Sequence, residues 1–285
     1  MNLCRFQDRA GQVRIGVLED STTVCDLTPA GLKEMQPVLE SVSPVEEIQK
    51  LLHPQLPRIA CSEVRLCAPV EHQEIWAAGV TYLRSKAARM EESDFSATAY
   101  DRVYAAERPE LFFKSLPEKV VAQGEPVGIR RDATWSVPEP EFALVINSSG
   151  RIVGYTIGND MSSRDIEGEN LLYLPQAKIY DRSCALGPCI TLGVPEAAAR
   201  EWAIRLHIHR QNQTVFSGET SVGQIKRSFT NLAGFLFRCQ QLPHGAILLT
   251  GTGVVPPETF SLQAEDIVEI EITGIGRLRN PVIVV

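Results

Sequence analysis

Two glutamates stand at the entrance to a strongly apolar run, where Pro138-Glu139-Pro140-Glu141 precedes residues 142–146 with the sequence FALVI. Because successive side chains of a β-strand alternate between its two faces, Glu139 and Glu141 project from the same face. Two carboxylates so close together repel each other, and burying them beside an apolar strand without a cation costs free energy. A divalent cation that prefers oxygen ligands removes both problems. The pair therefore predicts a metal site at the start of a buried strand, rather than two exposed carboxylates at a strand edge.

Two aspartates follow the next apolar segment, residues 152–157, and each is a candidate third ligand. Asn-Asp and Arg-Asp are also ordinary turn and helix-capping sequences, so neither aspartate is diagnostic by itself. Asp160 comes directly after the segment, and a hairpin of the two apolar segments would return it to the glutamate pair. This spacing favours Asp160 over Asp165. Three oxygen ligands without histidine or cysteine indicate Mg²⁺, Mn²⁺ or Ca²⁺ rather than Zn²⁺, and they leave coordination positions for water and a substrate.

Three cationic residues are candidates for a role beside such a site. Lys178 lies between a proline and apolar residues. It is either a surface lysine or a partly buried ammonium that stabilises negative charge at the metal site or transfers protons. Lys114 follows an aromatic segment and has a similar setting. Arg164 could clamp a substrate or simply pair with its neighbour Asp165.

Residues 250–253, Thr-Gly-Thr-Gly, resemble a tight turn in which Gly251 and Thr252 offer a backbone N–H and a hydroxyl to an anion. The signal is weak by itself, because the lysine of a phosphate-binding loop is absent. His207 and His209 share one face of an expected strand and could bind a metal, but the neighbouring arginines favour an exposed strand face. Neither a Ser-His-Asp order nor a Gly-x-Ser-x-Gly motif is present, which argues against a serine hydrolase.

The hydrophobic pattern predicts an irregular mixed-β core with a few peripheral helices. Helical spacing of apolar residues occurs at 30–53 and 229–240, whereas 217–228 is expected to form turns and short connections. Strands are expected at residues 3–6, 13–18, 24–27, 74–80, 111–113, 142–146, 152–157, 190–192, 203–209, 246–250, 267–273 and 281–285.

Two breaks in this pattern bear on domain organisation. His-Pro-Gln-Leu-Pro at 53–57 interrupts it like a linker, so we expect a small N-terminal α/β domain at residues 1–68 and a catalytic domain at 69–285. Residues 81–107 are polar, charged and roughly helical. Both a mobile lid beside a strand end and a pair of solvated surface helices fit that composition.

Composition argues against two classes of partner. The chain has 28 Lys and Arg residues against 35 Asp and Glu, a net charge of −7, and no long basic block, so a nucleic-acid surface is not expected. The apolar runs are far shorter than the about 20 residues that a membrane span needs, and the N-terminus lacks the apolar core of a signal peptide. Seven cysteines at irregular spacings match no common zinc motif. These features predict a cytoplasmic protein with reduced, mostly buried thiols.

Four motifs occur in a fixed order over about residues 70–285. They are Glu-x-Glu at 139–141, Asn-Asp-x-Ser-x-Arg-Asp at 159–165, Gln-Ala-Lys at 176–178 and Thr-Gly-Thr at 250–252. In this combination the chain resembles the fumarylacetoacetate hydrolase family. The resemblance implies an α+β fold, a mixed β-roll with peripheral helices and a small N-terminal domain. It also implies a homodimer or a dimer of dimers, and a Mg²⁺ or Mn²⁺ ion held by Glu139, Glu141 and Asp160.

The same resemblance implies roles for further residues. Lys178 matches a position that approaches the substrate near the metal, and Thr252 matches one that contacts a substrate carboxylate or oxo group. Residues 79–82 match the strand that leads into the family's lid, which places Tyr82 among the substrate-binding candidates. The other substrate-binding candidates are Lys114, Arg164 and Gly251.

One departure from the family pattern bears on the reaction. Many hydrolases and decarboxylases of the family carry a histidine and a glutamate, three residues apart, just after the position of Tyr82, where they orient a water. Residues 83–92 here read LRSKAARMEE, without histidine, which argues against water-activated C–C cleavage. The stretches 82–92 and 107–114 instead resemble the branch that contains 2-keto-3-deoxy-D-arabinonate dehydratase.

That branch implies a lyase that dehydrates a small-molecule 2-keto-3-deoxy sugar acid, for example to 2,5-dioxopentanoate. A metal chelated by the substrate's carboxylate and 2-keto oxygen would acidify the C3 proton and stabilise the enolate. Glu91, Glu92 or Lys178 is then the candidate base, and hydroxide leaves from C4. Two alternatives stay open: a hydrolase that cleaves a C–C bond in a 2,4-diketo acid, and a catalytically inactive metal-binding protein of the same fold.

Overall fold

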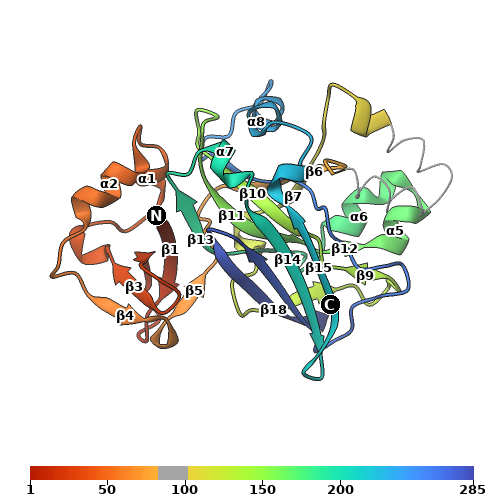
Figure 1. Ribbon diagram of the computed structural model, residues 1–285, viewed down its shortest axis with the longest axis horizontal. Helices are drawn as coiled ribbons and strands as arrows, with labels where there is room; N and C mark the ends of the chain where they lie inside the picture. Colours follow the sequence, from red (N-terminus) through yellow and green to blue (C-terminus); the bar gives the residue numbers. More distant parts are fainter. Residues whose placement is uncertain (83–101) are drawn as a thin grey trace.

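The computed structural model describes residues 1–82 and 102–285 of the chain (Figure 1). Strands dominate it and the helices are short, so the fold is α+β. The strands are β1 (Asn2–Gln7), β2 (Val13–Leu18), β3 (Thr23–Asp26), β4 (Arg58–Ala60), β5 (Arg65–Cys67), β6 (Glu74–Gly79), β7 (Glu110–Ser115), β8 (Val127–Ile129), β9 (Ser136–Val137), β10 (Pro140–Ile146), β11 (Ile152–Asp160), β12 (Ser162–Ser163), β13 (Cys184–Leu192), β14 (Ala203–Arg210), β15 (Gln213–Ser221), β16 (Ala246–Leu249), β17 (Ile267–Ile272) and β18 (Gly276–Val284). The α-helices are α1 (Gln36–Leu39), α2 (Pro44–Leu51), α5 (Arg164–Glu169), α6 (Leu174–Lys178), α7 (Glu196–Ala199) and α8 (Phe229–Leu236).

The strands form two larger sheets of mixed direction. The first has the order β4-β3-β2-β1-β13-β11-β10-β16-β6-β7, with β5 paired to β1, and the second has the order β15-β14-β17-β18-β8. Strands β9 and β12 form a short separate ladder. The pairs β16–β6 and β18–β8 are parallel, while the neighbouring pair β10–β11 is antiparallel.

The central strands of the first sheet are buried on both faces. In β10, Phe142 and Leu144 belong to a hydrophobic cluster that also takes residues from β14, β17, β18 and α8. Ala143 and Val145 point the other way, into a cluster with residues of β1, β2, α1 and α2. A strand covered on both faces needs apolar side chains at every position, which explains the continuous apolar run after Glu141.

The N-terminal segment joins the first sheet through β1. This strand pairs with β13, with Asn2 opposite Thr191 and Leu3 opposite Ile190. Figure 1 shows the segment, coloured red to orange, at one end of the molecule, where α1 and α2 lie beside the strands. The proposed division at residues 68 and 69 stays a prediction.

The expectation of turns at 217–228 is wrong in its first part. Strand β15 pairs with β14 from Gln213 opposite Arg210 to Ser221 opposite Ala203. It is the edge strand of the second sheet, and its residues are mostly exposed or half-buried. An edge strand of polar residues is held by its backbone ladder, so it lacks the apolar alternation by which strands are recognised.

Other elements differ in length from the expected ones. The helix expected at 229–240 ends at Leu236, and the helical spacing at 30–53 is realised in the two short helices α1 and α2. The expectation for 81–107 falls mainly outside the described residues. All seven cysteines are free thiols, four of them buried. In the described part of the chain, no helix combines the length and the hydrophobicity that a membrane crossing requires.

Candidate functional site

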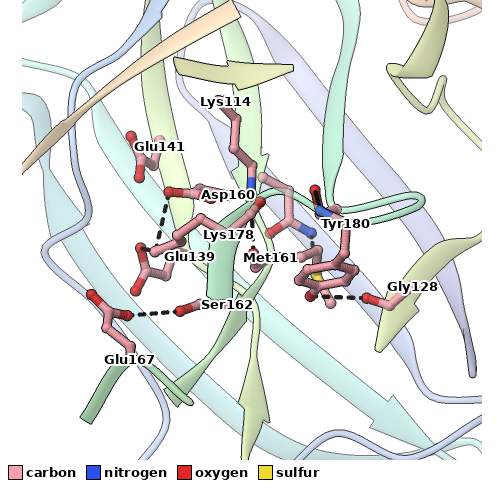
Figure 2. A network of polar contacts seen from close by, with 12 residues as sticks. Lys114, Gly128, Glu139, Glu141, Asp160, Met161, Ser162, Glu167, Lys178 and Tyr180 are labelled. Atoms are coloured by element: carbon pink, nitrogen blue, oxygen red, sulfur yellow. Dashed lines mark hydrogen bonds and ion pairs between the residues drawn. The ribbon is translucent and has the colours of Figure 1, made fainter. Parts of the chain in front are cut away.

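The hairpin of β10 and β11 brings three carboxylates together. Glu141 lies opposite Gly158 in the antiparallel register. Asp160 lies two residues beyond Gly158, so its side chain is on the face that Glu139 and Glu141 share. The ligand oxygens of these three acids lie within 4.8 Å of one another, and each residue is at most 2 % exposed. Figure 2 shows the three side chains grouped together. The structure thus groups the acids that the strand periodicity and the hairpin predict.

Buried cations hold two of the carboxylates. Lys178 Nζ lies 2.7 Å from Glu139 Oε2 and 3.1 Å from Asp160 Oδ2. Lys114 Nζ lies 2.5 Å from Asp160 Oδ1, and Arg164 Nη1 lies 2.9 Å from Glu139 Oε1. Both lysines are fully buried, and Arg164 is 4 % exposed. These contacts offset part of the free energy that burying carboxylates costs.

Each of these cations comes from a different element. Lys114 is on β7, Arg164 begins α5, and Lys178 ends α6. The helices α5 and α6 pack on each other and on β12, which follows Asp160 almost directly. At the start of α5, Arg164 contacts Glu139. Its neighbour Asp165 instead accepts hydrogen bonds from Thr134, from the backbone N–H at 2.6 Å and from the hydroxyl at 2.9 Å.

Glu141 is held differently from the other two acids. The Gly251 backbone N–H donates to Glu141 Oε2 at 2.6 Å, and no cation in the described ranges forms an ion pair with it. Burial, followed by the nearby carboxylates of Asp160 and Glu139, raises the pKa of Glu141 well above its usual range. A divalent cation would relieve this repulsion, and three carboxylates are a ligand set that Mg²⁺, Mn²⁺ and Ca²⁺ prefer. The residues present therefore fit a divalent metal.

The turn after β16 places the Gly251 N–H. The Thr250 N–H and hydroxyl donate to the Phe142 carbonyl at 3.0 and 2.7 Å, and the Thr81 hydroxyl donates to the Thr250 carbonyl. Gly251 has φ +86°, and a Cβ atom at this position would overlap Thr81 Oγ1. Only glycine fits here without strain. Thr252 is 5 % exposed, and its hydroxyl donates to the Val254 carbonyl at 3.0 Å.

A pocket opens over the carboxylates. Its lining combines charged side chains with apolar and backbone surfaces of β6, β7 and the turn after β16. The lining residues are Ala78, Gly79, Val80, Phe112, Glu139, Glu141, Asp160, Arg164, Gly251, Thr252 and Val255. Lys114 and Lys178, both fully buried, contact the carboxylates from within the protein. A few convergent charges among apolar walls are typical of a site for a small molecule.

Glu110 is a residue near this pocket that the sequence analysis missed. It begins β7 directly opposite Gly79 of β6. A Cβ atom on Gly79 would overlap the Glu110 carboxylate, and Gly79 lines the pocket. Glu110 does not itself line the pocket, but its carboxylate lies against Gly79, which does. Glycine at a strand end is typical of a close approach by another group, but the sequence does not say which group approaches.

Tyr82, His207 and His209 are not among the residues that line the pocket. Tyr82 is 1 % exposed and packs against Gly253, where a Cβ atom would overlap its ring. Burial raises the pKa of Tyr82 far above its usual value. His207 and His209 lie half-buried on β14, hydrogen-bonded to the hydroxyls of Ser217 and Thr214. The two candidate bases of the lid, Glu91 and Glu92, lie outside the described residues.

Both the sequence and the fold match known proteins. A model of the fumarylacetoacetate (FAA) hydrolase C-terminal family matches residues 74–283. A probable 2-keto-3-deoxyxylonate dehydratase of Haloferax volcanii is 40 % identical over 286 residues, which cover 96 % of each chain. The 2-dehydro-3-deoxy-D-arabinonate dehydratase of Saccharolobus solfataricus is 40 % identical over 224 residues, 78 % of this chain and 75 % of the relative. A structure of 2-keto-3-deoxy-D-arabinonate dehydratase complexed with magnesium and 2,5-dioxopentanoate matches with a TM-score of 0.84 at 33 % identity, covering 100 % of this chain and 99 % of that one.

Proposed function

The chain belongs to the fumarylacetoacetate hydrolase family, and we propose that it is a metal-dependent lyase that dehydrates a 2-keto-3-deoxy sugar acid. One observation carries the proposal. A group of three buried carboxylates lies at a pocket in a chain that is 40 % identical, over 96 % of its length, to a probable dehydratase. The related structure with magnesium and 2,5-dioxopentanoate supports a five-carbon acid as substrate and Mg²⁺ as the metal.

Glu139, Glu141 and Asp160 would hold the metal. Mg²⁺ is the first candidate, and Mn²⁺ and Ca²⁺ accept the same ligands. A divalent cation there would supply a Lewis acid that polarises the 2-keto group and makes the C3 proton more acidic. Lys178 and Arg164 hold Glu139, and the Gly251 N–H holds Glu141, so the ligands are already oriented.

Arg164 and Thr252 are the side chains that we assign to the substrate. Both line the pocket beside the carboxylates. The Arg164 guanidinium has several donors and contacts Glu139 through Nη1, and such a planar group suits a substrate carboxylate. We keep Gly251 and Tyr82 as further candidates, since Gly251 lines the pocket and Tyr82 lies just before the segment expected to form a lid.

Removal of the C3 proton needs a base, and we propose Glu110. Its carboxylate lies beside Gly79, which lines the pocket, and it does not belong to the candidate metal ligands. Glu91 and Glu92 stay alternatives. Lys178 is a weaker candidate, because proton transfer by this fully buried lysine would disturb its contacts with two carboxylates. We assign Lys178 to holding those carboxylates.

The proposed reaction balances with water as its second product. The base removes a proton from C3, a C3–C4 double bond forms, and the C4 hydroxyl group leaves with a proton as water. In the resulting unsaturated 2-keto acid, a proton moves from C5 to C3 and gives a C4–C5 enol. The proton of the C5 hydroxyl then moves to C4, which leaves an aldehyde at C5. No oxidant or reductant is needed.

Purified protein separates this proposal from its alternatives. It is incubated with Mg²⁺ and 2-keto-3-deoxy-arabinonate, 2-keto-3-deoxyxylonate or an acylpyruvate, with EDTA-treated protein as the control. NMR detection of 2,5-dioxopentanoate, dependent on Mg²⁺, would support the dehydratase. Pyruvate and a second carboxylic acid would instead identify a C–C hydrolase of a 2,4-diketo acid. Mg²⁺ binding without turnover of any substrate would identify a catalytically inactive metal-binding protein.

We also propose that the protein is a cytoplasmic homodimer or dimer of dimers. Support comes from the family's usual assembly and from seven free thiols, which suit a reducing compartment. Sedimentation equilibrium of the purified protein tests the assembly, and a single monomeric species would contradict it.

A further inference from the structure

Lys114 is a fully buried lysine whose ammonium contacts three oxygens inside the protein. Its Nζ lies 2.5 Å from Asp160 Oδ1 and donates to the backbone oxygens of Met161, at 3.1 Å, and of Lys178. The contact with Asp160 is an ion pair, whereas the two backbone oxygens accept hydrogen bonds from the ammonium. Figure 2 shows Lys114 and Lys178 beside Asp160. The sequence predicts Lys114 as a substrate-binding residue, but its side chain is fully buried and does not line the pocket.

Asp160 has an ammonium on each of its oxygens. Lys114 lies at Oδ1 and Lys178 at Oδ2. Glu141, in contrast, receives the Gly251 N–H and forms no ion pair within the described ranges. One carboxylate of the group is thus already neutralised by side chains, and another is left for an external cation.

We infer that Lys114 is a positioning residue that stands in for a cation on Asp160 while no metal is bound. It keeps Asp160 in place beside Glu141 in the metal-free protein, and it lowers the affinity of the carboxylates for a divalent metal. The second effect follows because two cations near one carboxylate repel each other, more strongly inside a protein than in water. The inference rests on the metal site of the proposed function, but not on the reaction.

Two neutral variants test it, with an exposed lysine as the control. Lys114→Met removes the charge and the donors, while Lys114→Gln removes the charge and keeps a donor for the two backbone oxygens. Lys119→Met alters an exposed lysine of the connection after β7. The melting temperature is measured with EDTA and with saturating Mg²⁺, and Mg²⁺ affinity is measured by calorimetry. Neither readout depends on catalysis.

The two neutral variants should melt below the wild type in EDTA, because Asp160 loses a partner. Mg²⁺ should raise their melting temperatures more than that of the wild type, and should bind them roughly tenfold more tightly as one repulsion is removed. Folding of Lys114→Met in Mg²⁺ but not in EDTA would support the inference in its strongest form. Lys119→Met should behave as the wild type throughout.

Two results would overturn the inference. An equal loss of melting temperature with and without Mg²⁺, at unchanged affinity, would show that Lys114 only supports the fold. Weaker Mg²⁺ binding by Lys114→Gln would show that the lysine arranges the site for the metal instead of replacing it. Should Lys114→Met not fold in either condition, Lys114→Gln decides alone. Wild-type protein that binds Mg²⁺ but turns over no sugar acid would refute the proposed reaction and leave this inference standing.

Discussion

Gly251→Ala tests how the turn after β16 builds the site. Gly251 has φ +86°, and a Cβ atom there would overlap Thr81 Oγ1 and lie 3.0 Å from the Ala78 carbonyl oxygen. A left-handed backbone costs alanine about 1–2 kcal/mol. Relief of the overlap moves the N–H that donates to Glu141, and a hydrogen bond to a charged group contributes about 1.5–3 kcal/mol. We therefore expect the free energy of unfolding to fall by about 2.5–5 kcal/mol, the sum of the two contributions.

Gly31→Ala is the matched control, since Gly31 has φ +97° and a Cβ atom added to it would have no neighbouring atom within 4 Å. It should lose only the backbone contribution of about 1–2 kcal/mol. Urea denaturation measures both losses, and calorimetry measures Mg²⁺ affinity, which should weaken in Gly251→Ala alone. Equal losses in the two variants, with Mg²⁺ affinity unchanged in both, would refute the reasoning that the turn positions Glu141.

The other predictions concern the acids of the site. Glu141→Gln should abolish turnover and weaken Mg²⁺ binding by on the order of 100-fold, because a ligand loses its charge, and retained activity would contradict the metal assignment. In EDTA, the raised pKa of Glu141 should destabilise the wild type as pH rises above 4.5, its ordinary value, toward the folded-state pKa. Urea denaturation from pH 5 to 8 measures the free energy of unfolding of the wild type and of Glu141→Gln. The wild type should lose stability relative to Glu141→Gln as the pH rises, and a constant difference would contradict the raised pKa of Glu141. Glu110→Gln should lower kcat by about 10²- to 10⁴-fold at unchanged Mg²⁺ affinity, with loss of deuterium exchange at C3 of the substrate, and exchange at the wild-type rate would exclude Glu110 as the base.

The grouping of the acids could be predicted because local rules relate them. Glu139 and Glu141 share a face by the period of two in a strand, and one hairpin returns Asp160 to them. The observed register, with Glu141 opposite Gly158, is what such a hairpin produces. The continuous apolar run after Glu141 likewise identifies a strand buried on both faces.

The partners of these acids could not be predicted in the same way. Lys114 and Arg164 reach the carboxylates from β7 and α5, and tertiary packing, rather than any periodicity, decides which side chains meet there. The sequence offered two partners for Arg164, a substrate and Asp165, and the structure adds Glu139. Glu110 was missed for a related reason. Its contact with Gly79 depends on the pairing of β6 with β7, and an acid before an aromatic strand looks the same whether or not it borders a pocket.

One face of β10 contributes to the hydrophobic core at one end of the strand and to the candidate metal site at the other. Val145 and Ala143 lie in the hydrophobic core, and Glu141 and Glu139 follow on the same face toward the pocket. The strand that builds the core therefore also fixes the proposed metal ligands, which leaves them little freedom to move.

The proposed base belongs to a different pair of strands. Glu110 lies at the start of β7, and β7 reaches β10 only through β6 and β16 in the described sheet. A substitution at Glu110 itself can thus remove the proposed base while Lys114, further along β7, still contacts Asp160. A fold arranged in this way can keep one site for a 2-keto acid while its reaction differs between relatives. On the proposed assignment the acids of the hairpin hold the metal for a 2-keto acid, and we expect the choice between dehydration and C–C cleavage to depend on the residues around Gly79.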